Sequence, residues 1–137
     1  MYSKIIVPVA LGGTGVGRGL VERARALLDR GGAIVLVHVM EPLPPYLAAT
    51  LPREQLAGRR RDVLRKLESL GAGAGKVSVD YDIREGNAPS KILAAAQDHA
   101  ADLILIGSHV PGFSDYFLGS TAARVVRHAQ CSVLVER

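Results

Sequence analysis

The chain has 137 residues, of which 48% are hydrophobic and 22% charged, and its formal net charge is +4. This length and composition predict one soluble globular domain over residues 1–137, able to bury a core without disulfides or metals. No apolar run approaches the length of about 20 residues that a membrane-spanning helix needs, and the N-terminus has no secretory signal pattern. We therefore expect a cytoplasmic protein with no membrane partner.

The cysteine content and the distribution of basic residues argue against two further kinds of ligand, zinc and nucleic acid. The single Cys131 excludes an intramolecular disulfide and a cysteine-based zinc site, and its apolar surroundings predict a small buried core residue. The densest basic cluster, Arg59–Arg61 with Arg65 and Lys66, lies on a predicted helix beside acidic residues and lacks interleaved aromatic residues. We predict a solvated helix face there and no nucleic-acid partner.

The first elements follow from apolar runs and their breaks. Residues 4–10 form a nearly continuous apolar run, which is typical of a strand covered on both faces. After a glycine-rich segment over residues 12–19, a helix is expected to end in the basic, glycine-capped turn Arg30–Gly32. Ala33–Met40 predicts a second buried strand, and the four prolines of Glu41–Pro52 predict a loop and no helix.

The middle of the chain changes from a helical period to a period of two. A long helix is expected over Arg53–Leu70, and residues 77–84 then alternate strictly between apolar and polar side chains. That alternation predicts a half-exposed strand at a sheet edge. Pro89 then begins a third helix, with Asn87 or Ala88 near its cap.

The last three elements complete the pattern. Leu103–Ile106 predicts a fourth strand, Ser120–Ala129 a fourth helix and Ser132–Glu136 a fifth strand. Strands that alternate with helices predict an α/β fold: a single, doubly wound, five-stranded parallel sheet with helices on both faces. Ligands of such sheets bind beyond the carboxyl ends of the strands, where the strand order reverses, and we expect the first and fourth strands to flank that point.

The segment Gly107–Thr121 lies at this expected ligand edge. It places a strand, a loop of small and hydroxyl residues and a helix start in succession. Free backbone N–H groups and the positive end of a helix dipole make such a segment a cradle for an anion such as phosphate. A plain strand-to-helix turn, which every α/β protein needs, explains the same pattern. Both interpretations stay open on this segment alone.

The sequence does not match several familiar ligand-binding motifs. The glycines over residues 12–19 fit no register of the dinucleotide fingerprint, and a P-loop that began at Gly12 would meet Arg18–Gly19 in place of Lys-Ser/Thr. The histidines show no metal-binding spacing; His38 is predicted to be a satisfied core histidine, and His109 is a candidate phosphate contact. We find no catalytic constellation.

Taken together, the pieces resemble the universal stress protein (UspA-type) family across essentially the whole chain. The matching pieces are Lys4–Val9, Val37–Val39, Arg84–Pro89, Leu103–Ser108 and Leu118–Ala122. The ending Val125–Val135 and the loop Ser108–Pro111 look especially like the F-type nucleotide-binding subgroup. The resemblance implies an adenine-nucleotide α-hydrolase-like fold, a homodimer, and ATP as the ligand, with or without Mg²⁺.

The resemblance also implies a set of site residues. Pro8 and Val39 would line the adenine pocket, Ile106–Gly107 would lie near the ribose, and Gly119–Thr121 would meet the phosphates. The physical chemistry agrees, because Gly119 has no side chain to block close approach and the two hydroxyls are donors. The full set of candidate nucleotide-binding residues is Pro8, Val9, Ala10, Val39, Ile106, Gly107, Ser108, His109, Gly112, Gly119, Ser120 and Thr121.

Two departures from the family pattern weaken the expectation of nucleotide binding. The family pattern G-x2-G-x9-G-(S/T) would need a second glycine at Val110, so that glycine is absent or displaced to Gly112. Ala10 stands where the family usually has an acidic residue, which removes a polar contact near the nucleoside and a route to Mg²⁺.

The leading hypothesis is a dimeric, ATP-binding protein of stress response or signalling, whose primary act is binding. A nucleotide-independent protein–protein interaction module of the same fold is the alternative, favoured by Ala10 and Val110. An enzymatic alternative is slow ATP hydrolysis or phosphate transfer onto a hydroxyl such as that of Ser120; no base or metal carboxylate is identified for it. The short apolar strand Ser132–Glu136 near the chain end predicts an uncovered sheet edge, and hence a homodimer formed through it.

Overall fold

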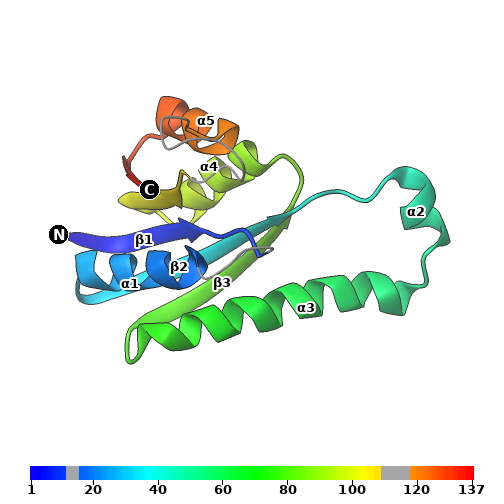
Figure 1. Ribbon diagram of the computed structural model, residues 1–137, viewed down its shortest axis with the longest axis horizontal. Helices are drawn as coiled ribbons and strands as arrows, with labels where there is room; N and C mark the ends of the chain where they lie inside the picture. Colours follow the sequence, from blue (N-terminus) through cyan, green and yellow to red (C-terminus); the bar gives the residue numbers. More distant parts are fainter. Residues whose placement is uncertain (12–15, 109–117) are drawn as a thin grey trace.

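A computed structural model describes residues 1–11, 16–108 and 118–137 as a five-stranded sheet flanked by helices (Figure 1). The elements in chain order are β1 (Tyr2–Pro8), α1 (Val16–Leu27), β2 (Leu28–Met40), α2 (Pro45–Thr50), α3 (Arg53–Gly71), the 3₁₀ turn η1 (Ala72–Ala74), β3 (Ser78–Glu85), α4 (Ala88–Asp98), β4 (Leu103–Gly107), α5 (Ser120–His128) and β5 (Ser132–Glu136). The strand order is β3-β2-β1-β4-β5 and every pair is parallel. The predicted α/β fold is confirmed, and the strand order reverses between β1 and β4, as expected.

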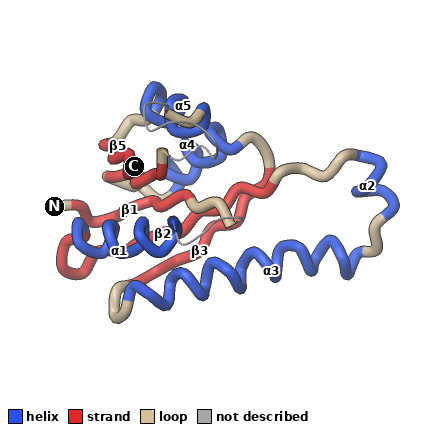
Figure 2. The backbone as a smooth tube through the Cα atoms, in the orientation of Figure 1, coloured by secondary structure: helices blue, strands red, loops and turns tan. Residues whose placement is uncertain are grey.

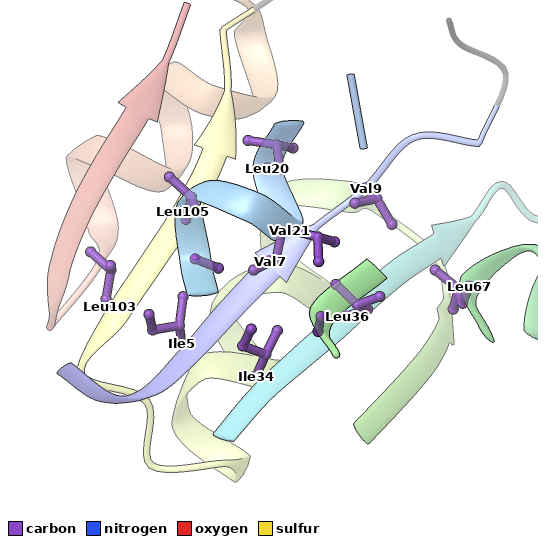
Figure 3. Close-up of a cluster of buried hydrophobic side chains, with 12 residues drawn as sticks. Ile5, Val7, Val9, Leu20, Val21, Ile34, Leu36, Leu67, Leu103 and Leu105 are labelled. Carbon is purple, nitrogen blue, oxygen red and sulfur yellow. The ribbon is translucent and has the colours of Figure 1, made fainter. Parts of the chain in front are cut away.

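Two apolar clusters hold the helices against opposite faces of the sheet (Figure 2). Ile5 and Val7 of β1 point toward α1 and α3, whereas Ile6 between them points toward α4 and α5. Figure 3 shows the first cluster, where strand residues such as Leu36 and Leu105 meet Leu20 and Val21 of α1. Because the central strands are covered on both faces, they need continuous apolar runs, which is the pattern that their sequences show.

The two outermost strands are β3 and β5. The residues of β3 are half-buried or exposed, and none is fully buried. The prediction of a half-exposed edge strand from its period of two is therefore confirmed. β5 also lies at an edge, paired with β4 from Leu103↔Ser132 to Gly107↔Glu136.

Two boundaries differ from the sequence-based expectation. The predicted loop over Glu41–Pro52 contains the short helix α2, because Pro45 stands at the first helical turn, where a missing N–H costs nothing. The first helix ends at Leu27, and β2 begins at Leu28 without a capped turn. Gly31 does adopt a left-handed φ of 81°, but within a register shift of the β1–β2 ladder. The glycine therefore marks a strand irregularity, which local sequence cannot distinguish from a helix stop.

The remaining helices agree with the expectation to within a residue or two. The α4 helix begins at Ala88, one residue before Pro89, and Asn87 caps it by accepting a hydrogen bond from the Ser90 N–H at 3.1 Å. Cys131 lies just before β5 and is half-buried, against the expectation of a fully buried core residue. None of the described helices is long and apolar enough to cross a bilayer.

Candidate functional site at the carboxyl edge of the sheet

The candidate site lies where β1 and β4 end side by side. Their parallel pairing runs through Ile5↔Leu103 and Ile6↔Ile104, so both carboxyl ends reach the same edge of the sheet. The helices that follow parallel strands start at this edge, and α1 and α5 therefore point their N-termini toward it. The topology of the backbone therefore places the carboxyl ends of β1 and β4 and the N-termini of α1 and α5 at one edge of the sheet.

An apolar wall forms on the α4/α5 face of this edge. Val39 and Ile106 belong to the cluster on that face, and Pro8 shares it because its side chain follows Ile6 by two positions along β1. Pro8 and Ile106 are buried, whereas Val39 is half-buried. The structure thus brings together the three residues expected around the base and ribose, and leaves Val39 the most accessible of them.

The backbone groups and the side chain of Val9 all make contacts within the protein. Its N–H donates to the Val37 carbonyl at 2.8 Å, and its carbonyl accepts from Nδ1 of His38 at 2.8 Å. Its side chain points to the opposite face, into the cluster of Figure 3. Val9 therefore positions the end of β1 and offers no free backbone group to a ligand. The prediction that His38 is hydrogen-bonded is confirmed, although the ring is half-buried and not fully enclosed.

Gly107 is the last residue of β4 and Ser108 follows it, and the two differ in how closely the protein surrounds them. A Cβ built on Gly107 would lie 3.8 Å from Cγ1 of Val16 and 4.0 Å from Cδ1 of Leu20, which is ordinary contact. The described residues around Gly107 therefore leave room for a side chain at this position. Ser108 is buried, and its N–H donates to the Glu136 carbonyl at 2.9 Å, so that donor is unavailable to a ligand.

Gly119–Thr121 starts α5, and its donors have no acceptor among the residues that the structure describes. Gly119 is the N-cap residue, and its carbonyl accepts the first helical hydrogen bond from Ala123 at 2.9 Å. The N–H groups of the first turn have no acceptor within the helix, and the first turn carries no acidic side chain. Among the described residues, the hydroxyls of Ser120 and Thr121 have no hydrogen-bond partner either. This helix start can therefore donate to an anion.

Ala10 lies exposed beside a cleft of about 370 Å³ between the start of α1 and α3. Arg18, Lys66 and Ser69 also line this cleft, and sequence reasoning assigned none of them to the site. Arg18 had a signal, because it follows a glycine-rich segment. Lys66 had none, since its position in the cleft depends on how α3 packs against α1.

Two candidate residues, His109 and Gly112, lie outside the described residues. Within residues 1–11, 16–108 and 118–137, no three His, Cys, Asp or Glu side chains gather as a metal site would require.

Comparison with known sequences gives matches along the whole chain. The model of the universal stress protein family matches residues 1–137. Universal stress protein G of Escherichia coli O157:H7 is 31% identical, with 100% of both chains covered.

Solved structures give the same fold. The UspA protein of Lactobacillus plantarum superposes with a TM-score of 0.75 at 25% identity, covering 99% of this chain and 98% of that one. A universal stress protein in complex with cAMP has a TM-score of 0.69 at 18% identity, with 99% and 97% coverage. The protein from Archaeoglobus fulgidus in complex with dAMP has a TM-score of 0.65 at 20% identity, with 99% and 98% coverage.

Proposed function

This chain belongs to the universal stress protein family, and from that premise we propose that it binds an adenine nucleotide, ATP in particular, at the carboxyl edge of its sheet. The whole chain would act as one such domain in stress response or signalling, by binding and not by turnover. Two structural neighbours are complexes with cAMP and dAMP, which supports adenine as the base. The resemblance to the F-type subgroup stays a prediction.

One arrangement carries the proposal. Pro8, Val39 and Ile106 share one face at the ends of three neighbouring strands. The α5 helix starts at the same edge, with donors that no described residue accepts from. An apolar slot next to a helix N-terminus suits a flat base joined to a phosphate. Within the proposed site, Gly107 would allow the ribose to approach closely, and Gly119–Thr121 would hold the phosphates.

The proposal is tested by denaturing freshly purified protein and identifying any released nucleotide by chromatography. We expect ATP or another adenine nucleotide, and a rise in Tm when ATP is added to nucleotide-free protein. Absence of both would refute nucleotide binding and favour the interaction module without nucleotide, to which Ala10 also points.

Gly119→Val tests the position of the phosphates. Gly119 has φ −58° and ψ 152°, a conformation that valine adopts readily, so the backbone there does not oppose the substitution. Its side chain would fill the approach to the α5 start and abolish nucleotide retention. Gly73→Val is the matched control, because a Cβ there meets no atom within 4 Å and Gly73 lies in η1, outside the site. Full retention of ATP in Gly119→Val would show that the phosphates bind elsewhere.

We further propose a homodimer through β5. This strand ends the sheet, and Leu134 on it is 37% exposed. Pairing of the open edge with the same strand of a second copy satisfies its free N–H and C=O groups and covers the apolar side chain.

A further inference from the structure

Positively charged side chains line the cleft between α1 and α3. Of the described residues that line it, two are cations, Arg18 and Lys66, and none is a carboxylate. Ser69 adds a hydroxyl, and the remaining lining residues are apolar or glycine: Ala10, Leu11, Val16, Gly17 and Leu70. A concave surface on which two positive charges lie close together attracts an anion.

The two cations have no partner of their own in the described parts of the chain. Neither the Arg18 nor the Lys66 side chain makes a hydrogen bond or an ion pair there. Two nearby arginines of α3 differ from them: Arg60 donates to the Ile83 carbonyl at 3.1 Å, and Arg65 lies 3.6 Å from Asp62. Two like charges that share a cleft repel each other, and a bound anion relieves that repulsion.

The cleft lies on the α1/α3 face of the sheet and borders two of the candidate nucleotide-binding residues, Ala10 and Gly107. Ala10, two residues beyond β1, belongs to both the cleft and that candidate set. Val16, which lines the cleft, lies 3.8 Å from the Cβ position of Gly107. Val16 also begins α1, whose first turn carries no acidic residue, so the positive end of this helix faces the same region.

We propose that this cleft binds a phosphoryl group of the ligand through Arg18 and Lys66, so that the protein holds a nucleotide polyphosphate without a divalent cation. The methyl group of Ala10 offers no oxygen to a metal ion, whereas the guanidinium of Arg18 and the ammonium of Lys66 neutralise phosphate charge directly. The inference rests on the proposed function for the identity of the ligand, and deepens it by naming polyphosphates as the preferred class.

Calorimetric titration of nucleotide-free protein with adenosine and with ATP, both in EDTA, tests the inference. The double variant Arg18→Gln/Lys66→Gln should bind ATP about 10- to 100-fold more weakly than the parent, because two charge-assisted contacts are lost, and bind adenosine equally well. Arg61→Gln/Arg65→Gln is the matched control. It removes the same net charge from exposed positions on α3 outside the cleft lining, and should leave ATP affinity within about 3-fold.

A second probe, inorganic tripolyphosphate, separates this inference from the proposed function. It should raise the Tm of the parent and of the control but not of the Arg18→Gln/Lys66→Gln variant. Equal binding of ATP and tripolyphosphate by the parent and that variant would overturn the inference. So would a requirement for Mg²⁺ in ATP binding. Failure of the parent to bind ATP, while tripolyphosphate still raises its Tm, would instead refute the nucleotide function and leave the cleft as a polyphosphate site.

Discussion

The two edge strands of the sheet, β3 and β5, differ in the side chains that they carry. An edge strand presents unpaired backbone groups that invite another chain. On the β3 side, charged side chains occupy the strand and its surroundings. On the β5 side, the strand presents Val133, Leu134 and Val135 between Ser132 and Glu136.

The β3 edge is protected by a charge network. Asp82 accepts hydrogen bonds from Arg84 at 2.9 Å and from Nε2 of His99 at 2.8 Å, and Arg84 also donates to Asp98 at 2.9 Å. These groups tie the strand to the C-terminal end of α4. From the other face, Arg60 of α3 donates to the Ile83 carbonyl. Charges that are already paired give a second chain little reason to dock.

The β5 edge has a different balance. Val133 and Val135 pack against the cluster under α4 and α5, while Leu134 faces the other way and stays 37% exposed. Val126 of α5 is exposed as well, at 47%. This difference is the reason why our proposal places the dimer interface at β5 and not at β3.

The largest expected effect comes from Leu134→Asp on β5. A two-fold axis would bring the two new carboxylates close together in the interface, and we expect the dimer dissociation constant to rise about 100-fold or more. Light scattering coupled to size exclusion would then report a monomer. Ser78→Asp, an exposed position on β3, is the control and should leave the mass unchanged. A Leu134→Asp protein of unchanged dimeric mass would remove β5 from the interface.

The next effect concerns the stability of the β3 edge. Asp82→Asn removes the charge that Arg84 and His99 share, and we expect the free energy of unfolding to fall by about 1–3 kcal/mol. Asp98→Asn is the matched control, since its side chain is 62% exposed, and should cost about 1 kcal/mol or less. Urea denaturation measures both. Equal losses from the two variants would show that the network acts as a set of surface pairs.

The pH dependence of the same network is a smaller effect. Burial raises the pKa of Asp82, but hydrogen bonds from Arg84 and His99 outweigh this and hold the pKa below its usual value of 3.8. Its stabilisation is therefore complete above about pH 4 and is lost as the pH falls through the pKa of the folded state. The stability difference between the parent and Asp82→Asn should shrink below pH 4. A difference that stayed constant from pH 7 to pH 3 would contradict the pKa shift.

The smallest effect lies at the start of β5. Burial raises the pKa of the Cys131 thiol above its usual value of 9.0, with a further contribution from Asp102. Less thiolate forms near neutral pH, so iodoacetamide should alkylate Cys131 at pH 8 several-fold more slowly than free cysteine. Mass spectrometry follows the reaction, and unfolding in urea should restore the rate. Equal rates in folded and unfolded protein would mean that the thiol is open to solvent.

Local signals in the sequence determined most of the fold. Continuous apolar runs marked β1, β2 and β4, because a strand covered on both faces needs apolar side chains at every position. The alternation over residues 77–84 marked β3 as an edge, and Asn87 with Pro89 marked the start of α4 to within a residue. Each of these signals depends only on residues within one helical turn or one strand, so it can be read directly from the sequence.

Tertiary structure alone decided what depends on distant contacts. The register shift that extends β2 back to Leu28 exists because of pairing with β1, and the glycine stop signal could not reveal it. Likewise, Arg18 and Lys66 are far apart in the chain and line one cleft only because α3 packs against α1. The sequence by itself determined a parallel α/β sheet and predicted the edge of it at which we propose that a ligand binds. Packing between remote elements decided which cations lie at that edge, because side-chain proximity across a fold leaves no periodic trace in the chain.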